Sequence, residues 1–425
     1  MASTRKIIPA ALFVLFWGLY VFLGIALGKT TAYHYNDALF GADLERVLGD
    51  MTAIAGDHSR TAIHPLFMLM ANPAGVVLAA TTGSRVAGAV IWNGAAGALC
   101  VALGFAFLSR AGMDAWRAAA WAALLGFSAT HLFFGAVPET WIFAGLGVIL
   151  LATCAQRWPA DWRRFVPAGV FALGAVTPNG AAALIAYAAG AARGSRPGRA
   201  VGKVAAYAAA VVGGAAGLSL VQKLIWPTSY LFFIPSAWRD DVTWYLGRLL
   251  HAGETAARAA RLAGYFFLYD VVAPRLAVAP GPSHKVCVPD VPYVTFNLGA
   301  FRPAGIAAAA LWLVLLGAGV FGWTRRRGER QPAATALWLL LVFNAVLLML
   351  YGSNELFLYG ANTVFIVWAL AALGAQGYYA AARPLVRWLH TGVLCACLVL
   401  VAINNLAFFL ELVKLYRENL IPLPW

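Results

Sequence analysis

Long apolar runs, almost free of charge and separated by short polar segments, make up most of this chain. Runs of about 20 apolar residues are typical of α-helices that cross the hydrocarbon of a bilayer. The runs predict membrane helices at residues 7–28, 86–109, 117–135, 138–155, 165–177, 180–192, 204–222, 304–323, 333–351, 361–379 and 389–410. The pattern therefore predicts an all-α polytopic membrane protein with about 11 transmembrane helices, folded as a single domain over residues 1–425.

Two apolar segments are interrupted by turn signals. Thr177-Pro-Asn-Gly180 divides residues 165–192 into two short helices, and Asn72-Pro-Ala-Gly75 interrupts residues 65–82, which we interpret as an interfacial helix. With these assignments and a cytoplasmic N-terminus, more than half of the 31 Lys and Arg residues fall in short cytoplasmic segments. The two large outer segments are then the first outer loop, residues 29–85, and the second outer region, residues 223–303.

Composition agrees with this class, since 62% of the residues are hydrophobic and 11% are charged. The formal net charge of +14 is spread in short runs between apolar segments, where it sets topology. A nucleic-acid-binding protein is excluded because no continuous basic stripe is present. The five cysteines show no CxxC or Cys/His spacing, so they predict no disulfide framework. The first apolar run is too long for a signal peptide and predicts an uncleaved helix.

Acidic residues are concentrated in the first outer loop, between helices that carry almost no charge. The loop contains Asp37, Asp43, Glu45, Asp50 and Asp57, together with Arg46, Arg60, His58 and His64. Any loop in water is polar, but carboxylates held beside lipid can also be tuned for acid–base chemistry. Glu139 and Glu355 lie in two further outer turns, where each either caps the following helix or presents an acid to the same face.

The second outer region mixes many aromatic residues with basic ones, including Arg302. This mixture is typical of an aromatic belt with arginines that reach the headgroup level. It is equally suited to bind a lipid-linked phosphate, and both interpretations stay open.

Several of these features together resemble the GT-C superfamily of integral-membrane glycosyltransferases, which includes protein O-mannosyltransferases and aminoarabinose transferases. His64-Pro-Leu-Phe67, at the start of the interfacial helix, is similar to the His-Pro-Pro-Leu element of the O-mannosyltransferases. Asp43-Leu-Glu-Arg46 is similar to the acidic and arginine cluster that follows the first helix in that superfamily. The short helix pair that meets at Thr177 is a further similarity. The sequence departs from the pattern in its single proline after His64 and in its separated acids.

The resemblance implies inverting transfer of a sugar from a polyprenyl-phosphate donor. Such a transfer needs a base for the acceptor proton and cations for the departing phosphate. Asp43 is the first candidate for the base and Asp37 the second, while Glu139 is a second acid that orients the acceptor or the sugar. The residues expected to bind substrate are Arg46, Arg60, His64, Arg302, Glu355 and Tyr359. No metal is assigned, although Mg²⁺ or Mn²⁺ between Asp43, Glu139 and a histidine stays open.

The expected partners are the lipid-linked donor, a glycan, lipid or protein acceptor, and membrane lipids. The expected location is the bacterial inner membrane, with the site facing outward and a role in building cell-envelope glycans. Two alternatives stay open. One is a secondary transporter or lipid flippase, although the expected spans carry no charge and show no inverted repeat. The other is a non-catalytic subunit of an envelope-assembly complex.

Overall fold

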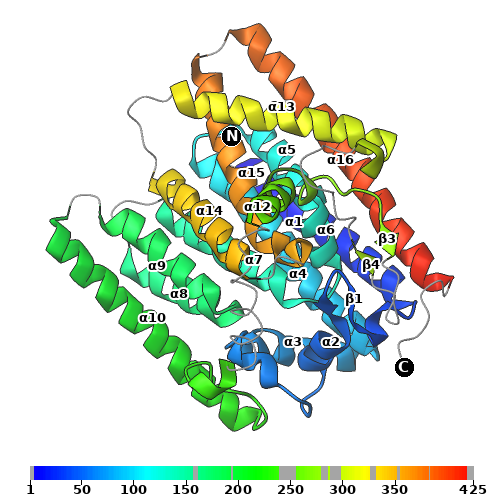
Figure 1. The fold of residues 1–425 in the computed structure, drawn as a ribbon, viewed down its shortest axis with the longest axis vertical. Coiled ribbons are helices and arrows are strands. Elements are labelled where there is room, and N and C mark those ends of the chain that lie inside the picture. Colours follow the sequence, from blue (N-terminus) through cyan, green and yellow to red (C-terminus); the bar gives the residue numbers. More distant parts are fainter. Residues whose placement is uncertain are drawn as a thin grey trace.

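A computed structural model describes residues 4–156, 161–192, 195–238, 255–278, 286–287, 298–325, 332–351, 355–381 and 383–418. The main helices are α1 (Thr4–Gly28), α4 (Arg85–Arg110), α5 (Ala115–Phe127), α6 (Ala129–Ala136), α7 (Thr140–Ala155), α8 (Trp162–Ala175), α9 (Pro178–Ala191), α10 (Pro197–Ile225), α13 (Pro303–Arg325), α14 (Pro332–Leu350), α15 (Leu356–Ala381) and α16 (Pro384–Arg417). Helices therefore form over every apolar run that the sequence singled out, and the all-α prediction is confirmed (Figure 1).

Not all of these helices are long enough to span a bilayer alone. Among the described residues, seven helices are both long and apolar enough to cross, and the bent pair α5–α6 makes an eighth if it is one span. The helices α7, α8 and α9 have only 16, 14 and 14 residues. The count of 11 spans therefore stays a prediction.

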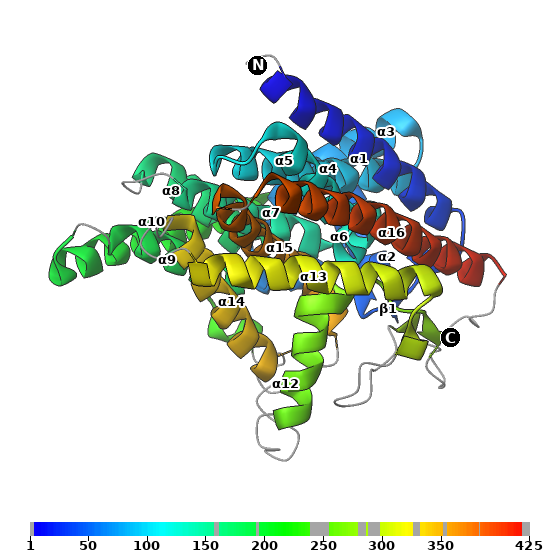
Figure 2. The same ribbon diagram turned by 90° about the horizontal axis from the view of Figure 1, so that it is seen from above.

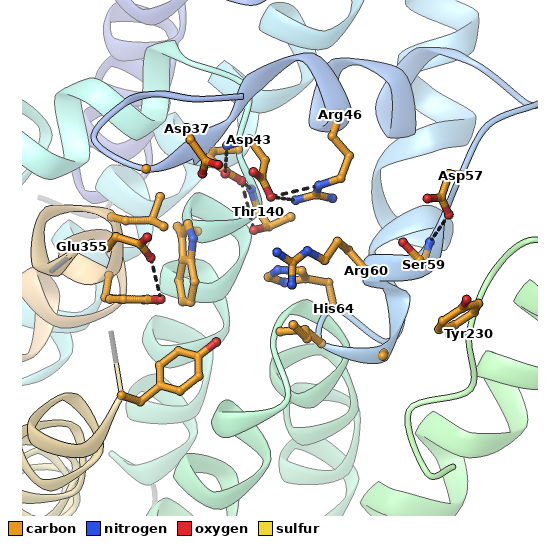
Figure 3. A pocket seen from close by; sticks show the side chains of 18 of the residues that line it. Asp37, Asp43, Arg46, Asp57, Ser59, Arg60, His64, Thr140, Tyr230 and Glu355 are labelled. Atoms are coloured by element: carbon orange, nitrogen blue, oxygen red, sulfur yellow. Dashed lines mark hydrogen bonds and ion pairs between the residues drawn. The ribbon is translucent and has the colours of Figure 1, made fainter. Parts of the chain in front are cut away.

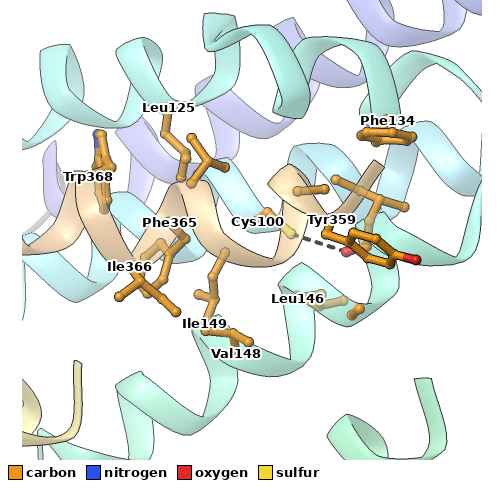
Figure 4. Packing of buried hydrophobic residues seen from close by; sticks show 14 of the residues in the cluster. Cys100, Leu125, Phe134, Leu146, Val148, Ile149, Tyr359, Phe365, Ile366 and Trp368 are labelled. Atoms are coloured by element: carbon orange, nitrogen blue, oxygen red, sulfur yellow. Dashed lines mark hydrogen bonds between the residues drawn. The ribbon is translucent and has the colours of Figure 1, made fainter. Parts of the chain in front are cut away.

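The core of the bundle is α15, which is buried along its whole apolar length. It packs against α7, α13 and α14, and Figure 4 shows Phe365, Ile366 and Trp368 among side chains from α5 and α7. The approach to α13 is close because Gly319 has no side chain: a Cβ there would lie 2.8 Å from the carbonyl oxygen of Ala371. Small residues at such contacts let helices approach in lipid, where packing replaces the hydrophobic effect.

The expected span at residues 117–135 is broken at Ser128, where α5 and α6 meet at 66°. The break leaves backbone groups without helical partners, and residues of the second outer region and of α16 satisfy them. Ala129 donates its amide to the carbonyl of Val271 at 3.1 Å. The side-chain amide of Asn405 donates to the carbonyls of both Phe127 and Val271. The break is stable because these bonds replace those of a continuous helix.

The second outer region is thus not confined to a surface. It contains α12 (Thr255–Gly264), which projects from the bundle in Figure 2, and a π-helix (Tyr265–Tyr269). Its next residue, Asp270, is completely buried. Residues 239–254, 279–285 and 288–297 of this region lie outside the described part of the chain, as do residues 352–354 of the turn before Glu355.

The first outer loop folds against one end of the bundle. It contains β1 (Asn36–Leu39), β2 (Ala42–Asp43), α2 (Leu44–Thr52) and α3 (Phe67–Thr82). The strands β1 and β2 join β3 (Ala277–Val278) and β4 (Val286–Cys287) in one sheet of order β2-β1-β4-β3. The helix α3 forms where an interfacial helix was expected.

A tight hairpin anchors this loop. Phe40 and Gly41 connect β1 to β2 with φ values of 55° and 78°, which is the geometry of a type I′ turn. The Phe40 ring packs against Phe133, Phe357 and Phe408 at centroid distances of 5.0, 4.6 and 5.9 Å. An aromatic cluster from α6, α15 and α16 therefore holds the loop in place.

The α8–α9 turn lies at the same end. The amide of Thr177 donates to the carbonyl of Ile63 at 2.9 Å, and the amide of Leu66 donates to that of Gly174 at 2.8 Å. The turn and the first outer loop consequently lie on the same side of the bundle, as the division of residues 165–192 into two helices predicted.

Candidate functional site

A polar cavity of about 690 Å³ opens at this end of the bundle. Its walls come from the first outer loop, the start of α7, the segment after α10, and the junction of α14 with α15 (Figure 3). The residues that line it are Asp37, Gly41, Asp43, Arg46, Asp57, Ser59, Arg60, Ala62, Ile63, His64, Glu139, Thr140, Trp141, Tyr230, Ala237, Tyr351, Glu355, Leu358 and Tyr359. Four segments far apart in the sequence thus enclose one polar space.

Asp43 precedes α2 but does not cap it with its side chain. Instead its Oδ2 accepts hydrogen bonds from Nε and Nη2 of Arg46 at 3.0 and 2.9 Å. Among the described residues, no group donates to the other oxygen, Oδ1. The side chain is 23% exposed, so this oxygen remains available to a molecule in the cavity.

Glu139 is buried and is fixed by the main chain around it. Its Oε1 accepts from the backbone amide of Asp43 at 3.2 Å. Its Oε2 accepts from the amide and the hydroxyl of Thr140, so the carboxylate caps α7. Burial raises the pKa of Glu139, and the nearby Arg46 opposes that rise. Both carboxylate oxygens of Glu139 thus accept hydrogen bonds from Asp43 and Thr140. These contacts suit a residue that positions Asp43.

Asn93 of α4 fixes the backbone of Glu139 and of the turn before it. Its Oδ1 accepts from the amide of Glu139 at 3.3 Å. Its side-chain NH₂ donates to the carbonyls of Phe134 and Gly135 at the end of α6 and of Val137 in the turn that follows. A buried side chain with this many partners sets the backbone of the turn rigidly.

His64 presents a fixed tautomer to the cavity. Its Nδ1 lies 2.8 Å from the carbonyl oxygen of Ala175. A carbonyl only accepts, so Nδ1 carries the proton and Nε2 carries a lone pair. Burial lowers the pKa of His64 to about 3, with Arg46 adding to the effect. His64 is therefore a neutral hydrogen-bond acceptor at physiological pH, and Figure 3 shows Arg60 beside it.

The opposite wall is aromatic and acidic. The Trp141 and Tyr359 rings meet edge to face at 4.6 Å, and Tyr351 lies 5.8 Å from Tyr359. The Tyr359 hydroxyl donates to Oε2 of Glu355 at 3.3 Å. Glu355 also packs on Gly41, where a Cβ would lie 2.9 Å from its Cγ. The hairpin turn and the start of α15 are thus in direct contact.

On the side of Arg46 away from Asp43 lies a contact that the sequence did not single out as a site. Nη1 of Arg46 donates to Oδ2 of Asp50 at 2.9 Å, and Nδ1 of His58 lies 2.8 Å from Oδ1 of Asp50. The spacing of Arg46 and Asp50 by four residues on one helix was a readable signal for their ion pair. The contact with His58 depends on the loop that follows α2.

Eight of the expected site residues line the cavity together: Asp37, Asp43, Arg46, Arg60, His64, Glu139, Glu355 and Tyr359. Arg302 does not. It directly precedes α13 and forms an ion pair with Glu411 of α16. The ion pair with Glu411 fixes its guanidinium away from the residues that line the cavity. The expectation that Arg302 binds substrate stays a prediction.

A metal was left open between Asp43, Glu139 and a histidine. Within the described residues, no three His, Cys, Asp or Glu side chains are grouped to hold a metal ion. The basic groups in the cavity are arginines, which can stabilise an anion by charge-assisted hydrogen bonds.

No protein-family model matches the chain, and comparison with characterised proteins finds no match in sequence. Among solved structures, the apo form of the oligosaccharyltransferase from Archaeoglobus fulgidus aligns with 98% of this chain and 56% of its own length. The identity is 14% and the TM-score is 0.45. The chain therefore spans little more than half the length of that protein.

The apolar helices and the polar cavity at one end of them define a polytopic integral membrane protein. What this cavity does must be inferred from its own residues.

Proposed function

We propose that the protein is a GT-C type glycosyltransferase that moves a sugar from a polyprenyl-phosphate donor to an acceptor. One observation carries the proposal: a carboxylate oxygen of Asp43 is available in a cavity that also contains Arg46 and Arg60. With the N-terminus in the cytoplasm, this cavity opens to the outer face of the membrane. A carboxylate beside cations suits the two demands of the reaction, proton removal and stabilisation of a leaving phosphate.

In the proposed reaction, Oδ1 of Asp43 takes the proton of an acceptor hydroxyl or amine. The freed electron pair attacks the anomeric carbon and forms the new glycosidic bond. The bond from that carbon to the phosphate oxygen breaks, and its electron pair leaves with polyprenyl phosphate. Attack from the side opposite the phosphate inverts the anomeric configuration. Arg60 binds the departing phosphate, because a guanidinium can donate two parallel hydrogen bonds to two phosphate oxygens.

The position of the cavity suits a lipid-linked substrate. It lies where the helices of the bundle end, between the first outer loop and the start of α15. A polar head group can enter it while an isoprenoid tail stays beside the apolar flanks of the helices. His64 and Glu355 then offer acceptors for sugar hydroxyls, and Trp141 and Tyr351 provide flat apolar surfaces.

The test is transfer by the purified protein in lipid nanodiscs, with synthetic polyprenyl-phosphate sugars as donors and release of polyprenyl phosphate as the measurement. We expect transfer by the wild type and a large loss in Asp43→Asn and Arg60→Gln. Matched controls at the other end of the bundle are Asp114→Asn and Arg163→Gln, which we expect to retain activity. Equal activity in all variants would exclude the cavity as the site.

A transporter is the second candidate, and one observation favours it. Asp270 is buried beside the broken α5–α6 helix, where its Oδ2 accepts from Thr363 at 3.1 Å. Broken helices and buried acids are typical of transport pathways. Lipid translocation in proteoliposomes discriminates the two: movement that Asp270→Asn abolishes and Asp43→Asn leaves intact identifies a transporter.

A further inference from the structure

Asp50 and His58 form an ion-paired contact just outside the cavity, and neither residue lines it. Asp50 is in the last turn of α2 and is 5% exposed, while His58 follows in the loop and is 2% exposed. Ionisable side chains are rarely buried so completely without a specific partner. A substrate in the cavity does not touch them, so any role in its chemistry must pass through another residue.

That residue is Arg46, whose guanidinium bridges two carboxylates. Nη1 bonds to Asp50, while Nε and Nη2 bond to Asp43 on the cavity side, all within 3.0 Å. Arginine presents these donors in a rigid plane, so fixing one edge of the guanidinium fixes the other. The orientation of the Asp43 carboxylate is thereby tied to the position of Asp50.

The backbone beneath the pair is also fixed. The side-chain amide of Asn72 in α3 donates to the carbonyls of Asp50 and Ala53 at 2.7 and 2.6 Å. This contact holds the end of α2 against α3. The Asp50 carboxylate therefore has little freedom to follow Arg46 if Arg46 moves.

Asp50 and His58 continue a line of alternating charges that ends in the cavity. In order from the cavity, the line consists of Asp43, Arg46, Asp50 and His58. The charged groups around this line are Asp57, in the same loop as His58, and Arg85 of α4, which donates to Thr52 at the end of α2. Glu139 lies at the cavity end of the line, where it accepts from the amide of Asp43 and interacts with the charge of Arg46. The hydrogen bond to Asp50 raises the pKa of His58, against the effect of burial. A protonated His58 balances the charge of Asp50 and leaves Arg46 to balance Asp43.

We propose that Asp50 and His58 are positioning residues that hold Arg46 against Asp43 and so keep the free oxygen of Asp43 aimed into the cavity. The role rests on the proposed function, since it assigns the pair to the same reaction. Without Asp50, the long Arg46 side chain gains rotamers and releases the Asp43 carboxylate. Misplacement of a base by about 1 Å can cost about 100-fold in rate.

The kinetic test compares Asp50→Asn with Glu45→Gln. Glu45 is an exposed acid on the same helix, so its substitution removes the same charge without touching Arg46. We expect Asp50→Asn to lower kcat by about 10- to 100-fold and to leave the KM for the donor unchanged. Equal kcat values in Asp50→Asn and Glu45→Gln would overturn the inference, and so would a change in KM alone.

Two substitutions at His58 separate positioning from a general loss of structure. The short amide of His58→Asn can still donate to Asp50, whereas His58→Ala cannot. We expect His58→Asn to retain more activity than His58→Ala and to lose the pH dependence that protonation of His58 contributes. Identical activity of both variants with the wild type would overturn the inference. Thermal unfolding of each variant confirms that the compared proteins are folded.

A measurement without turnover separates this inference from the proposed function. Titration of ¹³C-labelled His58 by NMR reports whether the pair is coupled to Asp43. We expect Asp43→Asn to lower the pKa of His58. Without the Asp43 carboxylate, the positive charge of Arg46 is balanced by Asp50 alone, and this disfavours a second positive charge on His58. An unchanged His58 titration would overturn the coupling. If the wild type transfers no sugar while the coupling is present, the proposed function fails alone.

Discussion

The backbone amide of Asp43 donates to Oε1 of Glu139 at 3.2 Å, across 96 positions of sequence. This bond joins the first outer loop to the start of α7 at the floor of the cavity. Glu139, which the sequence suggested as a second acid of the site, thus contacts the backbone of Asp43 with its carboxylate. The relationship predicts that Glu139 acts by placing Asp43.

Substitution of Glu139 tests this placement. In Glu139→Gln the side-chain oxygen can serve either Asp43 or Thr140, but the new NH₂ group faces a backbone N–H at the other position. We expect Glu139→Gln to fold and to transfer sugar more slowly. Glu139→Ala also loses the cap of α7, at a cost of about 1 kcal/mol, and should unfold at lower temperature. Full activity in Glu139→Ala would contradict a positioning role.

Asp43→Asn tests the base itself. Asn keeps the size and a hydrogen-bonding oxygen but lacks a basic carboxylate. We expect turnover to fall by about 10²- to 10⁴-fold, the usual contribution of a general base, with donor binding retained. Asp37→Asn is the comparison, because Asp37 lines the same cavity. Normal activity in Asp43→Asn with loss in Asp37→Asn would move the base to Asp37.

Gly41→Ala tests the contact between the hairpin and α15. Gly41 has a φ of 78° and a new Cβ would lie 2.9 Å from Cγ of Glu355. Gly83 is a matched control, since its φ is 68° and nothing lies within 4 Å of a Cβ built there. Both variants carry a left-handed strain of about 1 kcal/mol. We expect a further loss of stability and of transfer activity in Gly41→Ala alone. Equal effects would show that the Glu355 contact contributes nothing.

The helices were predictable because each apolar run is long enough to need lipid or a core on every side. The break at Ser128 was not, because the sequence around it contains no proline and its backbone partners, Val271 and Asn405, are far away in the chain. A local pattern cannot report a bond that only the folded bundle forms.

In the candidate site too, local sequence predicted some features, while others depend on residues that are distant in the chain. Asp43, Arg46 and Glu139 were selected because charge is rare in this chain and their segments fall on one side of the bundle. The ion pair of Arg302 was not predictable, because its partner Glu411 lies 109 positions later. The sequence indicated which residues could carry chemistry, but the pairing of the charges depends on the fold.

Two histidines give opposite dependences of stability on pH. His64 has a folded pKa of about 3, below the value of about 6.5 in an unfolded chain. The unfolded state therefore binds the proton first, and stability is lost as the pH falls from about 6.5 toward 3, by about 1.4 kcal/mol per unit at most. His58 has a raised pKa. Its contribution is full below about pH 6.5 and is lost as the pH rises through the folded value.

The measurement is thermal unfolding of the wild type, His64→Asn and His58→Asn between pH 3 and 9, taken as differences so that the common loss from carboxylates cancels. We expect His64→Asn to lose less stability than the wild type on the acidic side, because it has no imidazole that must stay neutral. We expect His58→Asn to be less stable than the wild type at low pH and to approach it as the pH rises, because the wild type then also lacks the imidazolium charge that stabilises Asp50. Parallel curves for all three proteins would show that neither imidazole is held in the protonation state that its contacts with Ala175 and Asp50 require.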